Sequence, residues 1–139
     1  MTSRQAVTGI GGVFFKARDP HALGEWYREH LGIPVPSGIT YVAFKADETG
    51  NDATGSRLVT VWSVFPETTE YFNPSKAPLM INYRVADLDA MLAQLRAAGV
   101  PVDDKVDDSE YGKFGWATDP EGNRFELWQP PAELPSDTV

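Results

Sequence analysis

The sequence contains no cysteine and only two histidines. Without cysteine, the protein has no disulfide bonds, no thiolate metal ligands and no cysteine nucleophile. The two histidines, His21 and His30, are nine residues apart in a segment with helical periodicity, which places them on roughly opposite faces of one helix. They therefore do not share a metal ion, and we interpret both as surface residues.

Positive charge and long apolar runs are also scarce. The chain has 12 Lys and Arg against 20 Asp and Glu, a net charge of −8, which argues against nucleic acid and anionic membranes as partners. No apolar run is long enough to span a bilayer, and the first residues lack the apolar stretch of a secretory signal. We therefore expect a cytoplasmic protein.

The composition is that of a folded domain. The 139 residues are 42% hydrophobic and 12% aromatic, which is enough apolar material for one core without covalent cross-links. We predict a single domain over residues 1–139.

The segment from Asp119 to Trp128 is the most informative part of the chain. Its first half, Asp-Pro-Glu-Gly-Asn, is typical of a turn, because proline presets one backbone angle while glycine and asparagine tolerate positive φ. Its second half predicts a strand over residues 124–128, in which Phe125 and Leu127 share one side and Glu126 lies on the other. The sequence thus predicts one carboxylate in the middle of a strand, on a face that also carries a cation and an aromatic ring.

The rest of the chain indicates an internal repeat of one structural unit. The first half predicts strands over residues 9–17, 41–44 and 57–64 and a helix from 20 to about 31; the second predicts strands over 79–85, 100–106, 113–118 and 124–128 and a helix after Asp87. Asp19 and Asp87 are 68 residues apart, and Gly32 and Gly99 are 67 apart. We therefore predict two βαβββ modules, 8–66 and 78–130, in an α+β fold with a curved mixed β-sheet, a central cleft and helices on the outer face.

The strands of both modules have one apolar side and one mixed side. We expect the apolar sides to pack under the helices, so that the mixed sides face a shared cleft, as in a small-molecule site. Glu126 is the candidate catalytic residue, although it could instead be an inert partner of an arginine. The candidate ligand-binding residues on the mixed sides, some of which could instead fill the core, are Phe14, Thr60, Trp62, Met80, Asn82, Arg84 and Trp128.

With the repeat and the last strand in place, the chain resembles the vicinal oxygen chelate superfamily, which includes glyoxalase I, extradiol dioxygenases and bleomycin-resistance proteins. The resemblance covers residues 8–130. It implies that modules pair around one cleft, either within the chain or across a homodimer, of which we favour the homodimer, and that Trp116 and Phe114 face the pocket and bind ligand. The motifs that carry it are Asp19-Pro20, Trp26-Tyr27, Leu31-Gly32, Val85-Ala86-Asp87-Leu88, Ala98-Gly99 and the segment 119–128.

The resemblance also implies four positions for metal ligands, which fall on Gly12, the neighbourhood of Thr60, Met80 and Glu126. Glycine has no side chain, a threonine hydroxyl is a weak ligand, and a thioether is too soft for hard divalent cations. One strong ligand is fewer than the three protein groups that most catalytic metal sites use. We therefore predict no bound metal and no cofactor.

Two functions fit this sequence. The first is a metal-free protein that binds a small, partly aromatic molecule in the cleft. The second is a lyase or isomerase of the glyoxalase type that uses Glu126 as a general base, with or without a divalent metal. In either case Lys16 and Arg84 are candidates for capturing an anionic ligand, and no feature of the sequence separates the two functions.

Overall fold

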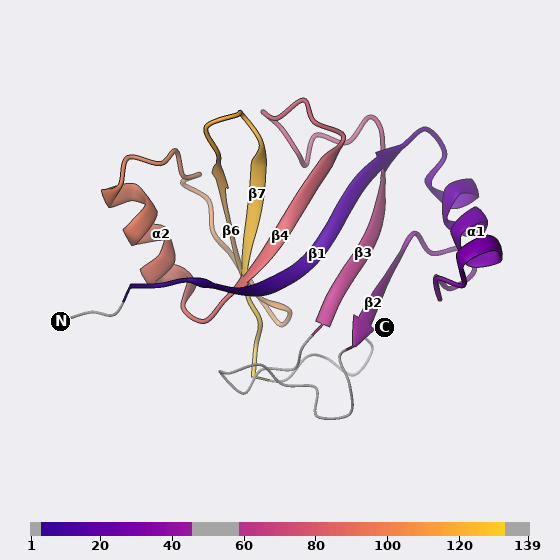
Figure 1. The fold of residues 1–139 in the computed structure, drawn as a ribbon, viewed down its shortest axis with the longest axis horizontal. Coiled ribbons are helices and arrows are strands. Elements are labelled where there is room, and N and C mark those ends of the chain that lie inside the picture. Colours follow the sequence, from indigo (N-terminus) through magenta and orange to yellow (C-terminus); the bar gives the residue numbers. More distant parts are fainter. Residues whose placement is uncertain (1–3, 46–58, 133–139) are drawn as a thin grey trace.

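The computed structural model describes residues 4–45 and 59–132, and within these ranges seven strands form one sheet. The sheet is mixed and curved (Figure 1), which confirms the predicted α+β fold, and its strand order is β2-β3-β1-β4-β7-β6-β5. In chain order the elements are β1 (Val7–Ala17), α1 (Pro20–Leu31), β2 (Tyr41–Lys45), β3 (Val59–Pro66), β4 (Leu79–Val85), α2 (Leu88–Ala97), β5 (Asp107–Ser109), β6 (Gly112–Thr118) and β7 (Arg124–Gln129).

Both helices begin at an aspartate and end near a glycine, as the sequence predicts. The side chains of Asp19 and Asp87 accept hydrogen bonds from backbone N–H groups three residues later, at 3.0 Å in each case, which satisfies a donor that the helix itself leaves unpaired. Gly32 follows α1 with φ 69°, and Gly99 lies beyond α2 with φ 81°. Positive φ at these positions is accessible to glycine without steric cost.

The centre of the sheet is the antiparallel pair β1 and β4. In the N-terminal half of the chain, the first strand β1 pairs in parallel with the last strand β3. In the C-terminal half, the first strand β4 pairs in parallel with the last strand β7. The next strands outward, β2 and β6, pair antiparallel with β3 and β7. The two halves therefore repeat one arrangement about the β1–β4 boundary, while the bounds 8–66 and 78–130 for the modules remain predictions.

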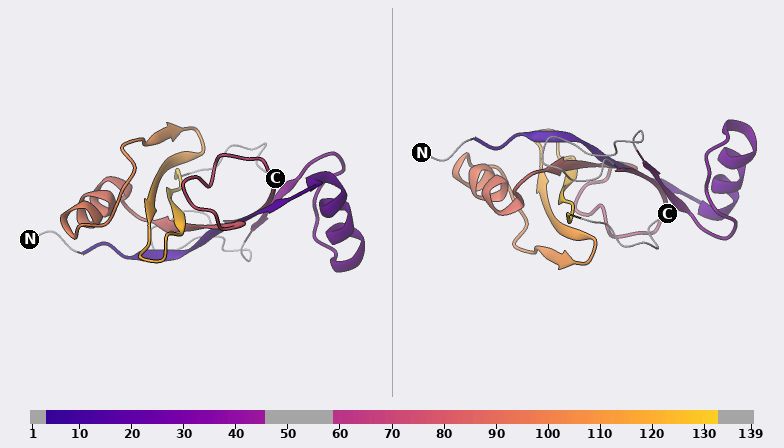
Figure 2. Two further views of the ribbon diagram at one scale, coloured as in Figure 1. Left: turned by 90° about the horizontal axis from the view of Figure 1, so that it is seen from above. Right: turned by 90° about the horizontal axis from the view of Figure 1, so that it is seen from below.

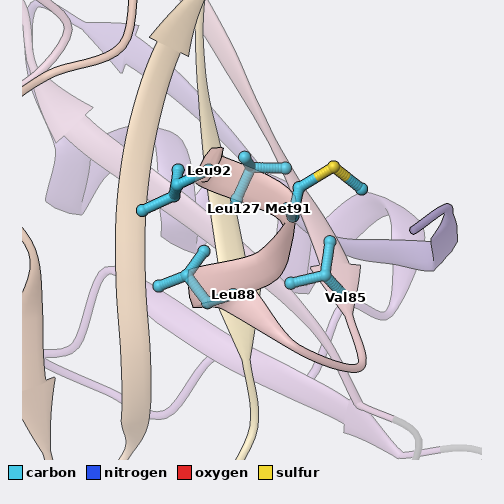
Figure 3. Close-up of a cluster of buried hydrophobic side chains, with 5 residues drawn as sticks. All are labelled: Val85, Leu88, Met91, Leu92 and Leu127. Atoms are coloured by element: carbon cyan, nitrogen blue, oxygen red, sulfur yellow. The ribbon is translucent and has the colours of Figure 1, made fainter. Parts of the chain in front are cut away.

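The helices lie at opposite ends of the sheet (Figure 2). Helix α2 covers the face opposite Glu126, where it forms the largest aliphatic cluster of the described residues (Figure 3): Val85, Leu88, Met91, Leu92 and Leu127. Helix α1 packs more loosely: its Tyr27 ring lies 6.2 Å from the ring of Phe15 and 5.2 Å from that of Trp62, measured between centroids. Neither described helix is long and apolar enough to cross a membrane.

Two predicted strands differ in the structure. The strand expected over residues 100–106 is absent except for an isolated bridge between Val102 and Ala117, because Pro101 lacks an N–H for a regular ladder. A short strand, β5, lies instead within the acidic segment that follows. Of the strand expected over 57–64, the described part begins at Val59, and residues 57 and 58 lie outside the described ranges.

The aliphatic cluster under α2 predicts a stability difference between two leucines. Leu88 is fully buried, whereas Leu31 at the end of α1 is 64% exposed. We expect Leu88→Ala to lower the free energy of unfolding by about 2–5 kcal/mol, because it removes buried surface and leaves a cavity. Leu31→Ala serves as the control and is expected to change it by less than about 0.5 kcal/mol. Urea denaturation measures both, and equal losses would contradict this packing.

Candidate functional site

A cleft of about 460 Å³ opens on the concave side of the sheet. Strands of both halves contribute to it, together with Tyr71 from the connector between β3 and β4. Its walls are mainly aromatic and aliphatic, with a few hydroxyls, one amide and one carboxylate. The lining residues are Phe14, Tyr41, Ala43, Val59, Val61, Ser63, Phe65, Tyr71, Asn82, Tyr111, Phe114, Glu126 and Trp128.

A second, larger groove of about 1020 Å³ runs beside α1, between residues such as Lys16, Trp26 and Glu67. None of its lining residues is buried, so it is an open surface depression without a desolvated polar group. The cleft, in contrast, contains buried Asn82 and Glu126 among apolar walls. A few convergent polar groups in an apolar pocket are the usual features of a binding site, so we take the cleft as the candidate site.

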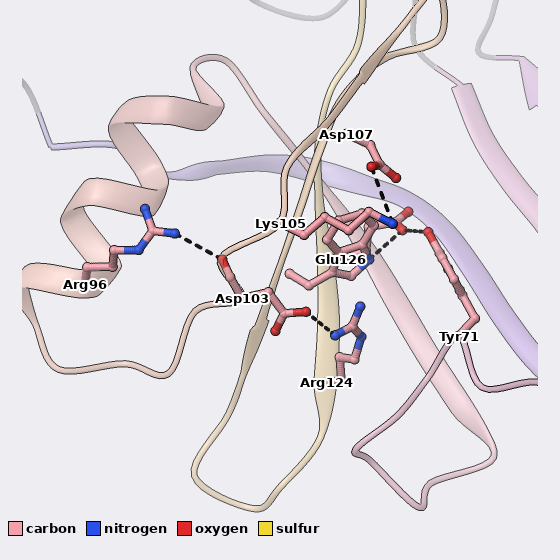
Figure 4. Close-up of polar contacts among 8 residues, drawn as sticks. Tyr71, Arg96, Asp103, Lys105, Asp107, Arg124 and Glu126 are labelled. Carbon is pink, nitrogen blue, oxygen red and sulfur yellow. Dashed lines mark hydrogen bonds and ion pairs between the residues drawn. The ribbon is translucent and has the colours of Figure 1, made fainter.

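The carboxylate of Glu126 is the central polar group of the cleft. It is 1% exposed and accepts hydrogen bonds from three side chains. The amide of Asn82 donates to Oε1 at 2.5 Å, and the indole N–H of Trp116 donates to Oε2 at 2.9 Å. The hydroxyl of Tyr71 also donates to Oε2 (Figure 4). A buried carboxylate without such partners would be strongly destabilising.

Strand register brings two of these donors to Glu126. Asn82 on β4 and Trp116 on β6 are its direct neighbours across the two ladders of β7. Paired residues point to the same face of a sheet, so all three side chains lie on the concave side. Gly11 on β1 leaves the space they need, since a Cβ there would clash with the Asn82 Oδ1 atom and lie 2.9 Å from the Trp128 ring.

The third donor, Tyr71, comes from outside the sheet. Its neighbour Phe72 is fully buried against Phe14, Met80 and Trp116, which anchors the connector over the sheet. The Tyr71 ring then stacks on Phe65 at 5.6 Å with an angle of 6° between ring planes. The hydroxyl is thereby held against Glu126.

Burial raises the pKa of the Glu126 carboxyl group above its ordinary value of 4.5, because desolvation disfavours the charged form more than the three donors favour it. The same desolvation, together with the nearby Glu126 charge, raises the pKa of Tyr71. Tyr71 therefore stays protonated as a hydrogen-bond donor, while Glu126 titrates closer to neutrality than an exposed glutamate.

The structure separates the predicted site residues into three groups. Glu126 lines the cleft as expected, as do Phe14, Asn82, Phe114 and Trp128. Three others, Met80, Arg84 and Trp116, are buried and do not line the cleft. Arg84 donates to the backbone carbonyls of Ile10 and Val59, at 2.7 Å each. Lys16 lines the open groove beside α1 instead.

The expectation that Thr60 and Trp62 face the cleft is wrong. Trp62 pairs with Val13 and packs beneath α1 against Phe15 and Tyr27. The hydroxyl of Thr60 donates to the backbone carbonyl of Ile10 at 3.2 Å. Both sides of β3 are mainly apolar and each carries one hydroxyl, from Thr60 on one side and Ser63 on the other, so the composition does not show which side faces the cleft. The parallel register with β1 decides it, and the residues that line the cleft are Val59, Val61, Ser63 and Phe65.

Sequence reasoning missed Tyr71, the only one of the three donors to Glu126 that was not a candidate. It also missed Tyr41 and the inward residues of β3. The connector has no strand or helix periodicity, so only the adjacent aromatic pair Tyr71-Phe72 in a polar segment could have marked it as part of the core.

The donor set of the cleft does not fit a divalent cation. At the level of Glu126, the neighbouring positions across the central strands are Asn82, Gly12 and Val61. Only the first of these has a side-chain oxygen, and the carboxylate itself already accepts three hydrogen bonds. In the described ranges, no group of three or more His, Asp or Glu side chains is arranged to hold a metal ion.

A sequence model of a known family matches this arrangement of elements. The model of the glyoxalase-like domain family matches residues 12–128 of the 139. The chain belongs to the glyoxalase-like domain family. A search of curated proteins finds no match.

Several solved structures share the fold of this glyoxalase-like domain. Methylmalonyl-CoA epimerase from Mycobacterium tuberculosis is similar with a TM-score of 0.61 and 22% identity, over 94% of this chain and 93% of that one. A methylmalonyl-CoA epimerase in complex with methylmalonyl-CoA and NH4⁺ has a TM-score of 0.63 and 21% identity, over 94% and 100%. A member of the glyoxalase/bleomycin resistance protein/dioxygenase superfamily from Vibrio splendidus 12B01 has a TM-score of 0.55 and 14% identity, over 91% of this chain and 99% of that one. These similarities show the shared fold.

The raised pKa of Glu126 predicts how stability depends on pH. The folded protein holds this proton more tightly than the unfolded chain, so the contribution of Glu126 to stability is largest below pH 4.5 and is lost as pH rises through the folded-state pKa. Glu126→Gln has no proton to lose. We therefore expect the variant to gain stability relative to the wild type as pH rises.

Urea denaturation between about pH 5 and pH 8 measures this difference. Glu121→Gln, the same substitution in the exposed turn, is the control and should follow the wild type at every pH. Parallel curves for Glu126→Gln and the wild type would show that the pKa of Glu126 is not raised.

Proposed function

We propose that this glyoxalase-like domain binds a small organic molecule in the cleft, with aromatic walls around it and without a metal ion. The observation that carries the proposal is the cleft of about 460 Å³, in which apolar walls from both halves of the sheet surround one buried, hydrogen-bonded carboxylate. Ligand pockets of this size commonly combine a predominantly apolar lining with a few fixed polar groups.

The geometry of the walls supports a flat or partly aromatic ligand. The rings of Phe114 and Trp128 are stacked, with centroids 5.9 Å apart and planes 5° apart, and Trp128 is fixed by donating to the Tyr111 carbonyl at 2.8 Å. The Phe65–Tyr71 stack belongs to the same cleft. Fixed aromatic surfaces of this kind bind planar groups at little cost in side-chain entropy.

The structural neighbours support binding of a small molecule but differ in the expected ligand. One methylmalonyl-CoA epimerase is crystallised with methylmalonyl-CoA, which carries a carboxylate and phosphates. In this chain the described residues that line the cleft include no Lys, Arg or His. The shared fold therefore supports small-molecule binding, whereas the lining does not favour the same anionic ligand.

Proton transfer is a second candidate function, since the pKa of Glu126 is raised toward the range in which a carboxylate acts as a general base. In that case Glu126 would remove a proton from a bound substrate in a lyase or isomerase reaction. Simple binding fits the geometry better, because the three hydrogen bonds that the carboxylate accepts from protein donors make it less basic.

Ligand binding in the cleft predicts a change in the fluorescence of Trp128. A ligand found by thermal-shift screening should quench tryptophan emission, and Trp128→Phe should remove most of the quenching. Trp26→Phe is the control, since Trp26 is 50% exposed on α1 and does not line the cleft. Quenching lost only in Trp26→Phe would place the ligand in the groove beside α1 and contradict the proposal.

The donor set predicts that metal ions do not affect this site. Titration of stripped protein with Zn²⁺, Ni²⁺ or Mn²⁺ in a calorimeter should show no stoichiometric sub-micromolar binding, and ligand affinity should be equal with and without EDTA. Tight one-to-one binding that is lost in Glu126→Gln would refute metal-independent function.

The two candidate functions are separated by Glu126→Gln once a ligand is known. If the protein is an enzyme that uses Glu126 as its base, the variant should keep ligand affinity and lose turnover by about 100-fold or more. If it only binds, products are absent for wild type and variant alike in a mass-spectrometric assay. An unchanged rate in the variant would exclude Glu126 as the base.

A further inference from the structure

We infer that the ligand of this cleft is a protonated amine carried on an aromatic or apolar body. The inference rests on the proposed function, since it names the chemical class that the same cleft takes. Three independent features of the described residues carry it: the charge of the lining, the unused acceptors at the floor, and the arrangement of the aromatic rings.

The lining has one acidic side chain, Glu126, and no basic side chain among the described residues. The arginine side chains near Glu126 have other partners. Arg124 forms an ion pair with Asp103 at 2.5 Å, and Arg84 donates to two backbone carbonyls beneath the cleft. Arg124 does not line the cleft, and its electrostatic effect on Glu126 is smaller than the effect of burial, so no cation within the cleft matches the charge of Glu126. In a desolvated site, an unmatched carboxylate attracts a cation and repels an anion.

Glu126 and Asn82 form the floor of the cleft, and together they offer more free hydrogen-bond acceptors than donors. The Oε1 atom of Glu126 accepts one hydrogen bond, from Asn82, although a carboxylate oxygen has two acceptor positions. The Oδ1 atom of Asn82 is buried and has no hydrogen-bond partner among the described residues. A ligand that completes this floor must bring N–H or O–H groups, and an ammonium group has three donors and no acceptor.

Aromatic rings surround this floor. The stacked pair Phe114–Trp128 and the stacked pair Phe65–Tyr71 come from different parts of the chain and line the same cleft with Phe14. The faces of such rings carry partial negative charge, so several of them together favour an ammonium group and its attached carbon atoms. A neutral ligand would use the same walls without satisfying the carboxylate.

The charge of the whole chain favours the same class of ligand. Its net charge is −8, which raises the local concentration of cations and lowers that of anions near the surface. Binding of an ammonium group also favours the ionised form of Glu126, since a nearby opposite charge lowers the pKa of a carboxyl group. The raised pKa of Glu126 is therefore compatible with a charged pair in the complex.

The test compares three probes of similar shape: 2-phenylethylammonium, 2-phenylethanol and 3-phenylpropanoate. Calorimetry and thermal shift at neutral pH measure their binding to the full chain, with Trp128→Phe to confirm that they occupy the cleft. We expect the ammonium to bind about tenfold or more tightly than the alcohol, and the carboxylate to bind more weakly than either. The comparison of affinities uses the wild-type protein, and Trp128→Phe serves only to locate the probes.

Two variants then locate the source of the preference. Glu126→Gln should bind the ammonium and the alcohol within about threefold of each other. Glu121→Gln removes the same charge from the exposed turn and should keep the wild-type preference. If both variants lose it equally, the preference comes from the net charge and the inference about the cleft is overturned.

The remaining outcomes are also decisive. If the alcohol or the carboxylate binds in the cleft as tightly as the ammonium, the inference is wrong while the proposed function stands. If none of the probes binds at millimolar concentration, the aromatic cleft does not take small aromatic molecules, and both the inference and the proposed function are contradicted.

Discussion

The burial of one carboxylate constrains the whole concave side of this protein. Glu126 is 1% exposed, and the hydrogen bonds from its three donors offset part of the free energy lost by removing its charge from water. Each donor comes from a different element: Asn82 from β4, Trp116 from β6 and Tyr71 from the β3–β4 connector. The site therefore exists only if both halves of the sheet and the connector fold together.

The remaining features of the fold support this arrangement from outside the cleft. The glycine at position 11 lets β1 approach the side chains of β4 and β7 closely, and the aliphatic cluster under α2 fixes the opposite face of the same strands. Phe72 anchors the connector that carries Tyr71. Packing on the convex side and anchoring on the concave side thus hold the donors at the distances that a buried charge requires.

Most of the fold could be predicted from the sequence because its signals are local and repeated. The aspartates at the helix starts, the glycines at their ends and the alternation around Glu126 all depend on neighbouring residues. The site was less predictable because it depends on register and on tertiary contacts. The two sides of β3 are similar, each mainly apolar with one hydroxyl, so the sequence does not indicate that Trp62 packs under α1, and Tyr71 lies in a segment without periodicity.

The same carboxylate connects the fold to the proposed chemistry, since it makes the cleft unsuitable for a hard metal ion and suitable for a ligand with hydrogen-bond donors. The most direct test is a ¹³C NMR titration of the glutamate side-chain carboxyl carbons, with the Glu126 signal assigned by its loss in Glu126→Gln. A midpoint clearly above 4.5 is predicted. A midpoint at or below that value would show an exposed or cation-bound carboxylate and would contradict the account.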